Sequence, residues 1–202
     1  MLTLGILLGN IVLLSGLAVV GWRNRSEPGA TIFALLESVS AVWTGLAVAG
    51  LRLPPGEARI RIRGAATGLS LVVVVLWMAF ILRYTGRDRW LRLDRLGVAS
   101  VPLLGGSLLY AFAPTWMPFV GRIEQSAIAP GTVVYSSIGP VGTVLAVYIY
   151  LFFLAGLLVV LKTIVETNTL YIGQALAFLL GTFVTIVASV GEIVGVPVGG
   201  YP

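Results

Sequence analysis

Long apolar runs, separated by short polar segments, dominate the pattern along this chain. A membrane-spanning helix needs about 20 predominantly apolar residues. Six runs approach that length, and they predict helices over residues 2–22, 31–51, 64–82, 96–112, 141–161 and 170–194. We therefore expect an all-α, polytopic transmembrane helix bundle of about six spans, formed by a single domain over residues 1–202.

Charged and turn-forming residues mark the ends of these runs. Arg23 and Arg25 follow the first run, and Ser26-Glu27-Pro28 then provides a typical helix start. Pro54-Pro55-Gly56 ends the second run in a turn. Pro102 predicts a kink or a break within the fourth span.

One charged segment allows two interpretations. Arg59-Ile60-Arg61-Ile62-Arg63 alternates with period two, which is typical of a short strand. No partner strand is evident in the sequence. We therefore favour the amphipathic first turns of the third helix.

The longest segment between spans is the loop 114–140. Ala129-Pro130-Gly131 predicts a turn, and Thr132-Val133-Val134-Tyr135 predicts a strand, so this outer loop is expected to hold a short hairpin. A loop of this length more often has a function than serves as a plain connector.

Composition supports an integral membrane protein. The chain is 58% hydrophobic and 10% charged, and its mean hydropathy is +1.01. Soluble domains are about 25% charged. The net charge is +5, but the basic residues lie mainly at the ends of apolar runs, so they indicate membrane topology and contact with the lipid bilayer rather than nucleic acid.

Two residue types are absent from the sequence, and their absence limits the chemistry. Without cysteine or histidine, the chain has no thiolate metal site, no imidazole-ligated haem and no phosphoacceptor histidine. No phosphate-binding loop or nucleophile motif is present. We expect no catalytic residues, no metal and no cofactor, so the chain itself is not expected to be an enzyme.

The distribution of basic residues predicts the orientation in the cell (plasma) membrane. Loops one, three and five hold eight of them: Arg23, Arg25, Arg83, Arg87, Arg89, Arg92, Arg95 and Lys162. Loops two and four hold five: Arg52, Arg59, Arg61, Arg63 and Arg122. Because basic loops stay inside, this bias favours an outside N-terminus and a cytoplasmic Arg83–Arg95 loop, although the Arg59–Arg63 cluster argues against it.

One stretch points to a family. Phe80-Ile81-Leu82-Arg83-Tyr84-Thr85-Gly86-Arg87-Asp88-Arg89-Trp90-Leu91 resembles the close of the third helix in the N-terminal seven-transmembrane sensor region of microbial, especially haloarchaeal, histidine kinases. Weaker similarities occur in the same order: Trp43, Pro102, Leu170-Tyr171-Ile172-Gly173-Gln174-Ala175 and Gly195-Val196-Pro197. The family continues into a seventh helix and downstream kinase domains. This chain is therefore expected to be a sensor region truncated before that helix, as a cloned fragment, a natural fragment or a degenerate gene.

The resemblance implies the signal-input domain of an archaeal-type two-component histidine kinase. Such a domain would sense a small or lipophilic ligand, or the state of the membrane, and transmit by rearranging its helices. Its expected partners are a small-molecule ligand, a second copy in a homodimer and the kinase domain of a full-length parent.

Polar and aromatic residues within the spans and outer loop are candidates for sensing. Glu37 lies within the second span, where a charge is costly, so it is expected to be protonated, paired or facing a wet cavity. Glu37 would be a ligand or proton site, or else a helix-to-helix hydrogen bond; Glu192 and the aromatic residues have the simpler interpretation of interfacial anchors. The candidate set is Glu37, Trp43, Trp116, Tyr135, Ser189 and Glu192.

The basic loop has two interpretations as well. It would transmit the signal or dock a downstream domain, or it would simply anchor the protein on anionic lipid. The residues concerned are Arg83, Tyr84, Arg87, Arg89, Trp90 and Arg92, with Asp88 and Asp94 expected to pair with neighbouring arginines.

Two other function classes remain open. The chain could be a small transporter or channel subunit that uses Glu37 and Glu192 on its path. It could also be a non-catalytic structural membrane protein.

Overall fold

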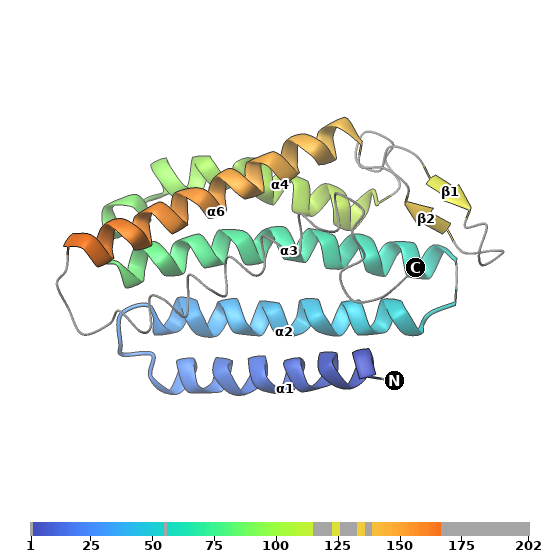
Figure 1. Ribbon diagram of the computed structural model, residues 1–202, viewed down its shortest axis with the longest axis horizontal. Coiled ribbons are helices and arrows are strands. Elements are labelled where there is room, and N and C mark those ends of the chain that lie inside the picture. Colours follow the sequence, from blue (N-terminus) through green and yellow to red (C-terminus); the bar gives the residue numbers. More distant parts are fainter. Residues whose placement is uncertain (1, 55, 115–122, 126–132, 136–138, 167–202) are drawn as a thin grey trace. The chain divides into compact units, whose positions relative to one another are not determined.

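The computed structural model describes residues 2–54, 56–114, 123–125, 133–135 and 139–166. Its described part is helical, apart from one small hairpin (Figure 1). The helices are α1 (Leu2–Arg23), α2 (Ala30–Arg52), α3 (Glu57–Tyr84), α4 (Val98–Phe112) and α6 (Pro140–Glu166). All five are long and apolar enough to cross a membrane, α4 together with the turn before it. The polytopic all-α bundle is thus confirmed, while the expected span 170–194 lies outside the described residues.

The hairpin lies between α4 and α6. β1 (Ile123–Gln125) pairs with β2 (Val133–Tyr135) in antiparallel register, with Ile123 opposite Tyr135. The pairing lies within the long loop in which the sequence predicts a short hairpin.

Two helices differ from their expected course. α3 begins at Glu57 rather than Gly64, so Arg59, Arg61 and Arg63 lie in its first two turns, as the helical interpretation predicts. Arg61 donates to Glu57 Oε1 one turn earlier at 2.6 Å, which holds this polar start together. Of the kink or break expected at Pro102, a break is absent, because α4 continues through this residue; a π-helical turn over Leu93–Gly97 precedes α4.

The chain divides into two compact units, Met1–Ile149 and Tyr150–Pro202, and α6 runs from the first into the second. In the first unit, consecutive helices pack side by side, α1 on α2, α2 on α3 and α3 on α4 (Figure 1). α3 is enclosed on two sides by α2 and α4. Its buried side chains supply most of the core of this unit: Leu71, Val74, Met78, Ile81 and Leu82.

Glycine brings α3 and α4 into close approach. Gly64 and Gly68 lie one turn apart on α3, and a Cβ at either would come within 2.5 Å of a backbone oxygen of α4, from Tyr110 and Ser107 respectively. On α4, a Cβ at Gly106 would meet Leu71 at 3.1 Å and Leu145 at 2.8 Å. Small residues four apart allow transmembrane helices to pack backbone to backbone.

Polar contacts also join helices within the described part of the first unit. Asn10 of α1 donates its side-chain amide to Thr44 Oγ1 of α2 at 3.5 Å. Tyr148 of α6 donates its hydroxyl to the Ala99 carbonyl of α4 at 2.7 Å. Inside a membrane such bonds replace the water that polar groups would otherwise need.

Candidate functional site

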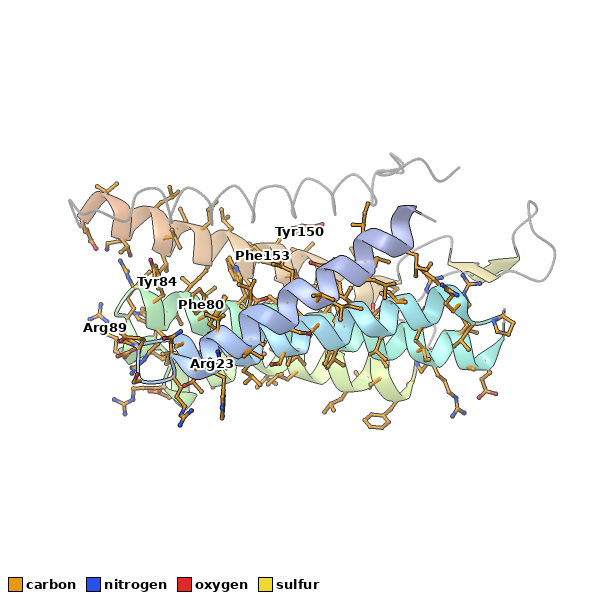
Figure 2. The ribbon with its side chains drawn as sticks, turned by 90° about the horizontal axis from the view of Figure 1, so that it is seen from below. Arg23, Phe80, Tyr84, Arg89, Tyr150 and Phe153 are labelled. Carbon is orange, nitrogen blue, oxygen red and sulfur yellow. The ribbon has the colours of Figure 1, made fainter. Side chains whose placement is uncertain are left out.

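Two turns bring most of the arginines in the described residues to one end of the first unit. Gly21 of α1 packs against Phe33 and Ala34 of α2, which fixes the α1–α2 turn. Gly29 in that turn lies against Phe80 and Arg83 at the end of α3. We call this region the arginine end; its arginines are Arg23, Arg25, Arg83, Arg87, Arg89, Arg92 and Arg95. Figure 2 shows Arg23, Tyr84 and Arg89 together there.

The Thr85-Gly86-Arg87 segment closes α3 with a glycine-based cap. Gly86 adopts a left-handed conformation with φ +68°. Its N–H donates to the Arg83 carbonyl at 3.2 Å, and the N–H of Arg87 donates to the Leu82 carbonyl at 2.8 Å. These are the two bonds of the Schellman motif, which satisfies the free carbonyls at a helix end. The Thr85 hydroxyl adds a bond to the Ile81 carbonyl at 2.8 Å.

Asp88 and Asp94 at the arginine end pair locally, as the sequence predicts. Arg83 Nη1 lies 2.6 Å from Asp88 Oδ2, and Arg92 Nε lies 3.8 Å from Asp94 Oδ1. All four side chains are well exposed, so each pair contributes at most about 1 kcal/mol. The first pair holds the short 3-10 turn Asp88–Trp90 back against the end of α3.

Aromatic rings stabilise both turns. Phe33 and Phe80 have ring centroids 5.5 Å apart, and Tyr84 stacks on Phe80 at 5.6 Å. A column of aromatic rings therefore links α2 to the end of α3, just before the Thr85-Gly86-Arg87 cap. Arg25 lies over the Trp22 ring at 5.7 Å, and Arg95 lies over the Trp90 ring at 4.8 Å. Each turn therefore carries one arginine–tryptophan pair.

Comparison with known families decides what this architecture is. A model of the family described as the N-terminal 7TM region of histidine kinase matches residues 6–201. The chain belongs to this family. No curated protein and no solved structure matches it. The match confirms the resemblance seen at Arg83–Leu91 and extends it over nearly the whole chain.

Membership in this family defines the role of the chain in outline. A 7TM region is the membrane part of a histidine kinase and is not itself catalytic, so kinase activity would lie in a domain outside this chain. Among the described residues, no three His, Cys, Asp or Glu side chains come together to form a metal site.

Glu37 is the notable polar group within the spans of the 7TM region. Its side chain is partly buried, and its Oε2 atom is buried with no hydrogen-bond partner in the described part of the chain. Ala34 and Thr44 on the same helix face contact α1 through Gly21 and Asn10. Glu37 lies between them on that face, about 10 Å along the helix from Ala30. Helix periodicity thus places Glu37 on the side of α2 that packs against α1.

Of the other predicted sensing residues, the structure describes the positions of two. Trp43 lies on α2 with 40% of its surface exposed. Tyr135 ends β2. Trp116, Ser189 and Glu192 lie outside the described residues.

Some residues that organise the site were not predicted from the sequence. Asn10, Phe33, Gly64, Gly68 and Tyr148 make the contacts between helices described above. Only Gly64 and Gly68 carried a usable signal, the spacing of two small residues four apart. Aromatic and amide contacts between helices have no comparable local pattern.

Proposed function

We propose that this chain is the signal-input domain of a two-component histidine kinase, one that senses a small or lipophilic ligand or the state of the membrane. Transmission would occur by a shift of helices between two arrangements that the kinase domain distinguishes. Family membership supports the sensor role in outline. The structural observation that carries the proposal further is the unpartnered carboxylate oxygen of Glu37.

A buried carboxyl oxygen without a hydrogen-bond partner is costly, so an arrangement that supplies a partner has an advantage. Glu37 faces α1, and at this depth the antiparallel register places Leu17 and Ala18 opposite it, neither of which offers a side-chain hydrogen bond. A ligand with a hydrogen-bond donor, or a movement of α1, would relieve the cost. The equilibrium between two packings of α1 on α2 would therefore respond to the signal.

We also propose roles for the remaining candidate residues and an orientation in the membrane. Trp43 and Trp116, Tyr135, Ser189 and Glu192 are proposed to contribute to the ligand site from the outer face. The arginine end is proposed to lie in the cytoplasm and the N-terminus outside, with a homodimer as the working unit.

Glu37→Gln in the histidine kinase that carries this region provides the test. The amide brings donors of its own, so we expect basal autophosphorylation in vesicles to change at least about threefold, as a shift of about 0.7 kcal/mol would produce. Ser38→Ala is the matched control, because within the described residues the Ser38 hydroxyl bonds only to the Ala34 carbonyl of its own helix. Equal autophosphorylation in wild type and Glu37→Gln would remove Glu37 from the sensing mechanism.

The gene itself offers a second test. We expect the reading frame to continue into a seventh apolar helix and then a helix that bears the phosphoacceptor histidine. A stop codon soon after Pro202 would contradict a kinase parent.

The unpartnered carboxylate of Glu37 also favours one alternative, a transporter or channel subunit with this residue on its path. Flux of protons or small cations into liposomes would distinguish it. Flux that disappears in Glu37→Gln would support the transporter, whereas absence of flux in both proteins would exclude it.

A further inference from the structure

We propose that the arginine end binds headgroups of anionic phospholipids, with Arg23, Arg25 and Arg89 as the residues that meet phosphate. This goes beyond the sensor function and does not depend on it. Three features of this end favour such binding: its available arginines, the depth at which they lie and the chemistry of their guanidinium groups.

Three arginines at this end are available to an anion. Arg23, Arg25 and Arg89 are exposed and form no ion pair within the described part of the chain. The ring of Trp22 under Arg25 uses a face of the guanidinium group but none of its N–H donors.

The acids at the arginine end do not neutralise it. Asp88 is engaged by Arg83, and Asp94 by Arg92. Glu27, in the α1–α2 turn, is the third acid at this end, so seven arginines face three carboxylates and the end carries four excess positive charges. Such a surface attracts anions over a distance of about 8 Å at physiological salt.

Helix length places this surface at the headgroup level. α1 has 22 residues and α2 has 23, which gives about 33 and 35 Å, slightly more than the hydrocarbon thickness of about 30 Å. The turn between them therefore emerges among headgroups. Trp22 and Trp90 are 58% and 45% exposed, and tryptophan is enriched at this interface.

The α3–α4 loop stays in the same layer. Its 3-10 turn over Asp88–Trp90 and its π-helical turn over Leu93–Gly97 fold it back on the helix ends, rather than letting it extend into water. Arginine side chains from both turns can then reach phosphates. Because the arginine side chains lie at the headgroup level, lipid phosphates reach them more readily than a soluble acidic domain would.

Guanidinium chemistry fits a phosphate better than a diffuse charge. Arginine presents paired N–H donors in a plane that matches two phosphate oxygens, whereas an ammonium group acts as a point charge. Twelve of the thirteen basic residues in the chain are arginine, and every one at this end is.

Lipid titration of the full chain in detergent, followed by native mass spectrometry, tests the proposal. Phosphatidylglycerol is compared with zwitterionic phosphatidylcholine for the wild type, R23Q/R25Q and R89Q. R59Q/R61Q is the matched control, because it removes two arginines at the same spacing from the other end of the unit. We expect the wild type to prefer phosphatidylglycerol, and its affinity to fall about five-fold for each arginine removed at the arginine end, with less than about twofold change in the control.

Equal affinity for the two lipids in the wild type would overturn the proposal, as would an equal loss in the control pair. Displacement of the lipid by an equal concentration of glycerol 3-phosphate would assign the site to soluble phosphates instead. If R23Q/R25Q loses helicity by circular dichroism, R89Q decides alone, and unchanged phosphatidylglycerol binding by R89Q would end the hypothesis.

Discussion

Gly86 explains why a glycine follows Tyr84-Thr85 at the close of α3. At φ +68° an L-residue brings its Cβ too close to the backbone, whereas glycine adopts this conformation without strain. The turn matters because it directs Arg87 and the following residues back over the helix end. A single backbone angle thus supports the position of the arginine end.

Gly86→Ala should lower the free energy of unfolding by about 1 kcal/mol, because the left-handed backbone conformation is strained for alanine and not for glycine. Thermal unfolding of the protein in detergent, followed by circular dichroism, measures the change. Gly105→Ala is the control, because Gly105 lies inside α4 and a Cβ there would meet nothing within 4 Å. A loss of stability in the control as large as in Gly86→Ala would refute the cap as the cause.

At the level of elements, α3 organises the first unit because it packs against a neighbour on each side. Toward α2 the contact uses aromatic rings, Phe33 on Phe80. Toward α4 it uses glycine, with Gly64 and Gly68 close to the α4 backbone. The second contact tolerates little change, because packed backbones leave no room for a side chain.

Gly68→Leu should therefore separate α3 from α4 and destabilise the protein by about 2–3 kcal/mol, as overpacking of a tight interface does. The same unfolding measurement applies. Gly45→Leu makes the identical substitution at a position on α2 where a Cβ meets nothing within 4 Å, and it should leave stability nearly unchanged. A stable Gly68→Leu would show that the helix pair adapts.

For the molecule as a whole, charge is divided between the two ends of the first unit. Seven arginines lie at the arginine end, while the region of the α2–α3 turn carries Arg52, Arg59, Arg61 and Arg63. Positive residues favour the cytoplasmic side of short loops, so the molecule should insert with the arginine end inside.

Single cysteines test this orientation, and the chain has no native cysteine to interfere. Glu27→Cys lies in the α1–α2 turn, and Ala58→Cys lies at the exposed start of α3, at the other end. In intact cells a membrane-impermeant maleimide should label Ala58→Cys and spare Glu27→Cys, and both should react after lysis. The reverse pattern would invert the proposed topology.

Several features follow from the sequence because they are local. Apolar runs of sufficient length predict helices, and opposite charges a few residues apart, such as Arg83 and Asp88, are expected to pair. The cap of Thr85-Gly86-Arg87 also depends only on near neighbours. The resemblance to the histidine-kinase 7TM region likewise rested on a contiguous motif, Arg83–Leu91, and the family match over residues 6–201 confirms it.

The rotation of each helix about its own axis was decided only by tertiary structure. In water the apolar face of a helix marks its buried side, but in lipid both the lipid-facing and the helix-facing side chains are apolar. Periodicity therefore does not show that Glu37 faces α1, that Asn10 meets Thr44, or that Gly68 packs on α4. Those contacts depend on the fit of whole helix surfaces, and they determine where a polar group within the membrane is left without a partner.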